Sequence, residues 1–132
     1  NNIKFEVKKH ESSENFLIEM NQYVTLGSAS KNARPILEKT NLIEAFDAIV
    51  DGNDVSNAKP DPEVFLMAAK KMNLSPSNCI VFEDAVAGIE AANAANMISI
   101  GIGDKKVLSQ ANYIFKDFTE ISIDFMKKLI NN

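Results

Sequence analysis

Short apolar runs typical of strands alternate along this chain with longer segments in which apolar residues recur at helical spacing. Strands are predicted at residues 23–27, 46–50, 79–82, 97–102 and 113–115. Helices are predicted after residue 32 and at residues 61–72, 85–95 and 122–130. Because strands and helices alternate, the sequence predicts one doubly wound α/β domain, with a parallel sheet and helices on both faces.

The first residues give a weaker pattern. Residues 3–7 alternate between apolar and polar, which predicts a half-exposed strand. Ser12 or Ser13 is suited to cap a short helix after it.

Several local features predict how the central elements begin. Pro35 is tolerated near the first turn of its helix, where Ile36 and Leu37 are expected to face inward. Asp61 is suited to the N-cap of the next helix and Pro62 to its first position.

Other features predict how these elements end and pack. Asn73 can adopt the left-handed conformation that closes a helix. The unbroken apolarity of residues 79–82 predicts a fully buried strand.

Composition narrows the function classes. The 132 residues are enough for one domain with a real core, and 45% of them are hydrophobic. The net charge is −4 without a cluster of Lys or Arg, which argues against nucleic acid as a main partner. No apolar run approaches the length of a membrane span, and no signal segment opens the chain. The single cysteine, Cys79, cannot form an internal disulfide, so we expect a buried thiol and a cytoplasmic location.

Three groups of polar residues follow predicted strands, where open parallel sheets bind ligands. The first group is Ser28, Ala29, Ser30, Lys31 and Asn32. It offers two hydroxyls, a cation, an amide and backbone N–H groups at a helix start, which are the donors that a phosphate needs. The alternative is that these residues only cap the helix.

The other two groups are Lys59, directly before Pro60, and the adjacent carboxylates Glu83 and Asp84. A lysine here can neutralise phosphoryl oxygens, and two carboxylates at the rim of the core can bind Mg²⁺. Taken singly, the lysine and the acidic pair can also be ordinary surface residues. Their order along this fold favours a phosphate and magnesium site.

These segments resemble the haloacid dehalogenase superfamily, in particular its β-phosphoglucomutase-like branch. The resemblance spans about residues 16–103, and the motifs lie within 23–103. The segments at 26–33, 59–65 and 82–91 resemble the second, third and fourth motifs of the branch, and residues 46–52 resemble the strand between motifs. Residues 1–22 match the family poorly. The resemblance implies a Rossmann-like core that acts on a sugar phosphate, as mutase or phosphatase.

The resemblance also implies roles for individual residues. Ser28 would hydrogen-bond the transferring phosphoryl group, and Lys59 would neutralise that group and the nucleophile. Asp84 would bind Mg²⁺ directly, with Glu83 close by or binding through water. Ser30, Lys31 and Asn32, in the phosphate-binding segment 28–32, would hold the non-reacting phosphate.

The sequence departs from the family at the nucleophile. The family carries an Asp-x-Asp motif on its first strand, followed by a helical cap domain, and neither occurs here. Glu6 lies in the nearest candidate strand, and the segment 51–54 looks like the motif but falls on a later strand. His10 lies in a charged stretch and is expected in a solvated loop. The simplest hypothesis is the C-terminal part of a mutase-like protein.

Two alternatives remain. One is a catalytically silent domain that keeps only the phosphate and metal pocket. The other is a two-component receiver domain, which is also doubly wound. A receiver needs an acidic pair after its first strand, and here the order is Ser28, Lys59 and then Glu83 with Asp84, which argues against it.

Overall fold

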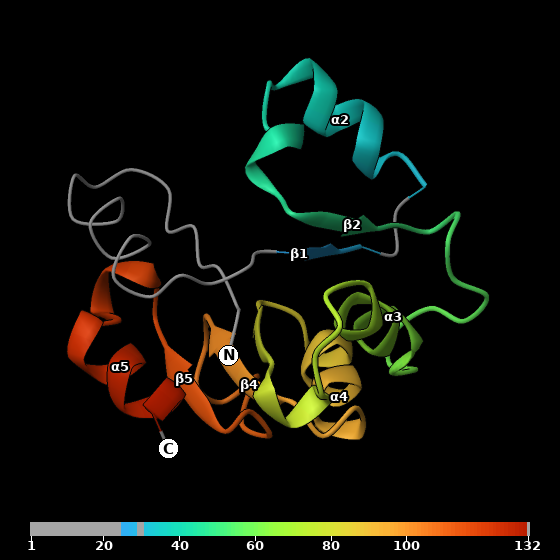
Figure 1. The fold of residues 1–132 in the computed structure, drawn as a ribbon. Coiled ribbons are helices and arrows are strands. Elements are labelled where there is room, and N and C mark those ends of the chain that lie inside the picture. The colour runs from blue at the N-terminus through green and yellow to red at the C-terminus, as the bar shows by residue number, and fades with distance from the viewer. Residues whose placement is uncertain (1–24, 29–30, 132) are drawn as a thin grey trace.

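The computed structural model describes residues 25–28 and 31–131 of the chain (Figure 1). The strands are β1 (Thr25–Gly27), β2 (Ala48–Val50), β3 (Ile80–Glu83), β4 (Ile98–Ile102) and β5 (Tyr113–Phe115). The helices are α2 (Ala33–Lys39), α3 (Glu63–Lys71), α4 (Val86–Ala94) and α5 (Ile123–Asn131). Short 3₁₀ turns occupy Ile43–Ala45, Pro76–Asn78 and Phe118–Glu120. The strand predicted at 3–7, the helix capped at Ser12 or Ser13, and His10 lie outside the described residues.

All strand pairs among the described residues are parallel. β1 pairs with β2, with Leu26 opposite Ile49. β3, β4 and β5 form a second sheet in sequence order, with Phe82 opposite Ile100 and Gly101 opposite Ile114. The prediction of an α/β fold with a parallel sheet is confirmed, although the described strands form two sheets.

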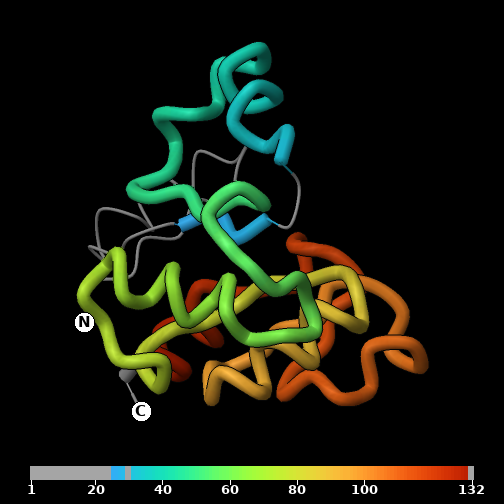
Figure 2. The backbone as a smooth tube through the Cα atoms, turned by 90° about the vertical axis from the view of Figure 1, so that its right-hand side faces the viewer, coloured from blue at the N-terminus to red at the C-terminus, as the bar shows by residue number. Residues whose placement is uncertain are grey.

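Helix α3 connects the two sheets. It contacts β1 and β2 on one side and α4 on the other, and α4 packs on β3 and β4. In Figure 2 the light green segment that contains α3 lies between the blue and teal segments above and the yellow and orange segments below. The core is therefore continuous across both sheets.

The core follows from the helical spacing of apolar residues. The buried face of α3 consists of Val64, Phe65, Ala68 and Ala69, which recur at helical spacing. Helix α4 buries small residues, which lets its backbone approach the sheet closely. Met126 of α5, which was not predicted as a core residue, is also buried in the core.

Most predicted boundaries agree with the structure to within two residues, and Asn73 has the expected left-handed backbone, with φ 57°. Helix α3 begins one residue later than predicted, at Glu63, and the Asp61 carboxylate accepts the Glu63 N–H at 2.9 Å. The described part of the predicted strand 23–27 is β1 (Thr25–Gly27), and residues 23–24 lie outside the described residues.

Two predictions about burial are wrong. Ile36 is 55% exposed, because α2 turns only Ala33 and Leu37 toward the core. Of residues 79–82, predicted to be fully buried, Cys79 and Val81 are buried, whereas Ile80 and Phe82 keep some exposure. An unbroken run of apolar residues indicates that a strand is buried on average, but it does not determine how completely other elements cover each of its two faces. Within the described residues, no helix is long and apolar enough to cross a membrane.

Candidate functional site

Lys59 and Glu83 form the central contact of the site. The Lys59 Nζ lies 2.6 Å from Glu83 Oε2, although 24 residues separate them in the sequence. Both side chains are largely buried, with 18% and 12% of their surface exposed. Glu83 is the last residue of β3, so the pair lies at the carboxyl end of the sheet, as the sequence predicts for a ligand site.

Two residues of α3 fix the approach of Lys59. The Lys59 ammonium lies over the Phe65 ring, 5.2 Å from its centroid, which is a cation–π arrangement. The Glu63 carboxylate accepts hydrogen bonds from the backbone N–H groups of Ser56 and Asn57, at 2.7 and 2.9 Å. These bonds fold the loop before Lys59 onto the start of α3.

The same hydrogen bonds affect the acidity of Glu63. The N–H of Ser56, followed by the side-chain amide and N–H of Asn57, lowers the pKa of Glu63 below its usual value, against a smaller opposing effect of burial. Glu63 could not be recognised from the sequence, because a glutamate at a helix start has many roles and the sequence does not identify its partners.

Glu83 has little room to move. A Cβ built on Gly88 of α4 would lie 2.0 Å from the Glu83 Cγ and Cδ and 2.1 Å from its Oε2. The absence of a side chain at Gly88 therefore makes space for the Glu83 carboxylate. Its Oε1 accepts the N–H of Asp84 at 3.2 Å, whereas Asp84 itself is exposed.

Glu83 and Asp84 fit Mg²⁺ by the chemistry of their donors. Mg²⁺ prefers hard oxygen ligands and is commonly held by one or two carboxylates together with water and substrate phosphate. Across the part of the chain that the structure describes, no three or more His, Cys, Asp or Glu side chains form a cluster that could hold a metal alone. This acidic pair is thus suited to a metal that phosphate and water also bind.

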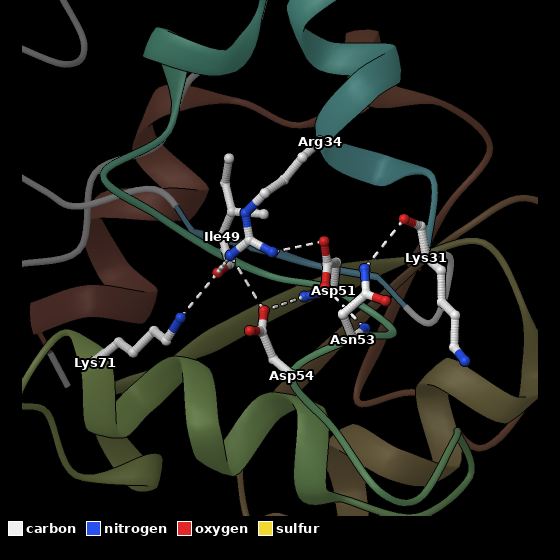
Figure 3. Close-up of polar contacts among 7 residues, drawn as sticks. All are labelled: Lys31, Arg34, Ile49, Asp51, Asn53, Asp54 and Lys71. Atoms are coloured by element: carbon white, nitrogen blue, oxygen red, sulfur yellow. Dashed lines mark hydrogen bonds and ion pairs between the residues drawn. The ribbon is translucent and has the colours of Figure 1, made fainter.

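The predicted phosphate-binding segment follows β1. Ser28 continues the pairing of β1, since its N–H donates to the Val50 carbonyl at 2.8 Å. Asn32 precedes α2, and its carbonyl accepts the first helical N–H, from Ile36. Lys31 is exposed, and its side chain extends away from the other six residues drawn in Figure 3. Ala29 and Ser30 lie outside the described residues.

Directly beside this segment is a polar cluster around Arg34, for which the sequence gives no signal. Arg34 Nη1 donates to Asp51 Oδ2 at 2.6 Å, and Arg34 Nη2 donates to the Ile49 carbonyl at 3.0 Å and to Asp54 Oδ2 at 3.1 Å (Figure 3). Asp51 is only 1% exposed, so the arginine neutralises a buried carboxylate. The Asp51 N–H and then Arg34 lower the pKa of Asp54 below its usual value, against a smaller opposing effect of burial.

Ser28 directly follows β1 and Glu83 ends β3, and Lys59, in the loop before α3, is in direct contact with Glu83. Ser28, Lys31 and Asn32 follow β1, which belongs to the sheet of β1 and β2 and not to the sheet that contains Glu83. Their convergence with Lys59 and Asp84 around one ligand remains a prediction. Segment 51–54 looks like a nucleophile motif, but its Asp51 is buried and forms an ion pair with Arg34.

Comparisons with known proteins agree on one family. A family model for haloacid dehalogenase-like hydrolases matches residues 15–96. The β-phosphoglucomutase of Bacillus subtilis is 35% identical over 103 residues, which are 78% of this chain and 46% of that protein. The fructose-1-phosphate phosphatase of Escherichia coli is 42% identical over 79 residues, 60% of this chain and 42% of that protein.

Solved structures give the same result. The crystal structure of β-phosphoglucomutase from Clostridium difficile superposes with a TM-score of 0.80 at 40% identity, and covers 89% of this chain and 54% of that chain. This chain spans about half the length of the relatives it matches.

Proposed function

The chain belongs to the haloacid dehalogenase-like hydrolases, in their β-phosphoglucomutase-like branch, and on this premise we propose that it serves magnesium-dependent phosphoryl transfer on a hexose phosphate, as part of a mutase or a phosphatase. The observation that carries the proposal is the contact of Lys59 with Glu83 at the carboxyl end of β3. It joins a phosphate-neutralising cation to a carboxylate suited to a metal. The names of the relatives, a mutase and a sugar phosphatase, support the substrate class.

Lys59 neutralises the oxygens of the transferring phosphoryl group. Glu83 and the Phe65 ring hold its ammonium in one orientation, so little reorganisation is needed when charge develops on those oxygens. Ser28 follows β1 and donates its hydroxyl to the same group. Both roles are positioning and charge stabilisation, which dominate catalysis of phosphoryl transfer.

Lys31 and Asn32, with Ala29 and Ser30, hold the non-reacting phosphate of the substrate. The Lys31 ammonium supplies a positive charge and the Asn32 amide a directional donor. An attached phosphate bound here orients the sugar, so binding energy far from the reacting atoms improves the geometry at Lys59.

Asp84 and Glu83 would hold Mg²⁺, Asp84 directly and Glu83 close by. A bound Mg²⁺ supplies charge stabilisation for phosphoryl oxygens. Glu83 already shares its charge with Lys59 at 2.6 Å, whereas the exposed Asp84 carboxylate is accessible to a hydrated cation.

The nucleophile belongs to a strand that this sequence does not contain. No Asp-x-Asp occurs among its 132 residues. Within the described residues β1 pairs only with β2, and β3 pairs only with β4, so each keeps an edge that can accept a further parallel strand. An aspartate at the carboxyl end of a strand placed between them would lie next to the residues that follow β1 and β3.

A binding and activity experiment tests this function. We expect the 132-residue chain to bind glucose 6-phosphate in the presence of Mg²⁺, measured by calorimetry, and to turn it over little or not at all, because the covalent route needs the missing nucleophile. Fusion to an upstream segment that carries a cap and an Asp-x-Asp strand should give turnover that Lys59→Ala abolishes. Binding without turnover in the fusion would favour the catalytically silent domain. Absence of binding would contradict the proposal.

A further inference from the structure

The predicted phosphate-binding segment is attached to the end of β2 at three points. At its start, the Ser28 N–H donates to the Val50 carbonyl at 2.8 Å. At its end, Arg34, the second residue of α2, forms its ion pair with Asp51. Between these, the side-chain amide of Asn53 donates to the Lys31 carbonyl at 3.2 Å (Figure 3).

The turn that provides two of these attachments is closed by hydrogen bonds of its own. The Asp54 N–H donates to the Asp51 carbonyl at 3.0 Å, and Asp51 Oδ1 accepts the Asn53 N–H at 2.9 Å. Asp54 Oδ2 accepts the Asp51 N–H at 2.9 Å. These bonds fix the direction in which the Asn53 side chain leaves the turn.

The turn is also anchored to the rest of the domain. Arg34 and Lys71 both donate to the Ile49 carbonyl, at 3.0 and 3.1 Å, from α2 and α3 (Figure 3). Asp51 is buried, so its ion pair with Arg34 is difficult to exchange for water. The turn that binds the Lys31 carbonyl through Asn53 is therefore itself connected to α2 and α3.

On these contacts we propose that Asn53 is a positioning residue for the sugar phosphate, acting through Lys31. Its amide holds the Lys31 carbonyl, and the Lys31 side chain extends away from the cluster (Figure 3). Fixing the backbone while leaving the ammonium exposed directs that cation toward a phosphate without neutralising it. Arg34 and Asp51 hold the turn that carries Asn53. This inference rests on the proposed function, in which Lys31 binds the non-reacting phosphate.

Because a hydrogen bond from Asn53 holds the backbone of Lys31, we expect the site to discriminate between phosphate ligands. A ligand with two phosphates engages Lys59 and Lys31 together, so its affinity depends on the distance between the two cations. Inorganic phosphate can bind at either cation alone and depends on that distance much less. Asn53 should therefore affect glucose 1,6-bisphosphate strongly and inorganic phosphate weakly.

Asn53→Asp is the most informative variant, because it keeps the size of the side chain and places an acceptor opposite the Lys31 carbonyl. We expect it to weaken binding of glucose 1,6-bisphosphate about threefold to tenfold, the range for loss of one hydrogen bond, with little change for inorganic phosphate. Asn53→Gln, which retains the amide, should restore part of the affinity. Asn78→Ala is the matched control, because Asn78 is exposed on a distant turn.

A double-mutant cycle shows whether Asn53 acts through Lys31. In a Lys31→Ala background, Asn53→Asp should have almost no further effect on bisphosphate affinity. Amide NMR resonances of Lys31 and Asn32 should shift on bisphosphate binding in the wild-type chain and shift less in Asn53→Asp, while melting temperatures stay close to that of the wild type.

The outcomes separate this inference from the proposed function. Equal bisphosphate affinity in the wild type and Asn53→Asp would overturn the role of Asn53 and leave the proposed function standing. An additive effect of Asn53→Asp and Lys31→Ala would overturn the route through Lys31. Failure of the wild-type chain to bind either phosphate ligand would overturn both proposals.

Discussion

The Lys59 ammonium meets the Glu83 carboxylate at 2.6 Å, between the loop before α3 and the last residue of β3. The Phe65 ring lies beneath the ammonium, and Gly88 leaves the space that the carboxylate fills. Four segments of the chain thus define one ion pair. These contacts hold the Lys59 ammonium in place before a ligand binds, as a preorganised phosphate site requires.

Removing the cation of this pair should cost stability. Lys59→Met leaves a largely buried carboxylate without its partner, and we expect a loss of about 1 to 3 kcal/mol in the free energy of unfolding by urea. Adding Glu83→Gln should recover part of the loss, because the unpaired charge is then absent. Lys105→Met, at an exposed lysine, serves as the control and should change little. A loss in the double variant equal to the sum of the losses in the two single variants would show that the ion pair contributes no coupling energy.

Gly88→Ala should impair the site more than the helix. The new Cβ would overlap Glu83, so that side chain must move and its bond to Lys59 must lengthen or break. We expect weaker binding of glucose 6-phosphate with Mg²⁺ by calorimetry, while the helical signal in circular dichroism is kept, since alanine favours helices. Ala94→Ser, on the exposed side of α4, is the control. Unchanged affinity in Gly88→Ala would argue against a fixed Glu83 position.

Asp84→Asn should weaken Mg²⁺ binding more than Glu83→Gln does. Asp84 is exposed at the end of β3, whereas Glu83 is already engaged with Lys59. A neutral amide is a poor substitute for a carboxylate ligand of Mg²⁺, and we expect about tenfold or greater loss for Asp84→Asn. Titration with Mg²⁺, followed by amide NMR, measures both variants. Equal losses would contradict the assignment of Asp84 as the direct ligand.

The loop that carries Lys59 should loosen in acid through Glu63. The N–H of Ser56 and the groups of Asn57 lower the pKa of Glu63 in the folded protein below its unfolded value. The stabilisation from this carboxylate is therefore complete above the unfolded pKa and is lost as pH falls through the lower folded pKa. The amide resonances of Ser56 and Asn57 should move together on titration into this acidic range.

Glu63→Gln provides the comparison for this titration, because glutamine keeps the shape of the side chain and does not ionise. The acid-dependent shift of both amides should disappear in that variant. A shift that persists in Glu63→Gln would assign the effect to another group.

Local patterns in the sequence determine the type and order of the elements. The residues 113–115 form a strand as predicted, and small residues at 86–94 form a helix close to the sheet. Asn73 closes α3 because its side chain tolerates the left-handed backbone that ends a helix. These outcomes depend on the spacing of apolar residues and on the conformational preferences of single residues, and both can be read from a short stretch of sequence.

The order of motifs likewise determines the family and the candidate residues. Lys59 and Glu83 are identifiable from their positions before a helix and at the end of a strand. What the sequence does not specify is the partner of each. Arg34, Asp51 and Asn53 gave no local signal for their contacts, because residues 17 to 22 positions apart in the chain meet only when the start of α2 comes close to the end of β2.

Tertiary structure alone decided burial and distance. Ile36 has the spacing of a core residue but remains exposed, since no described element covers that side of α2 closely enough to bury it. Asp51 is charged and is nevertheless buried, because Arg34 neutralises it. Burial depends on which surfaces meet after chain segments distant in sequence come together, and a local pattern of apolar and polar residues does not contain that information.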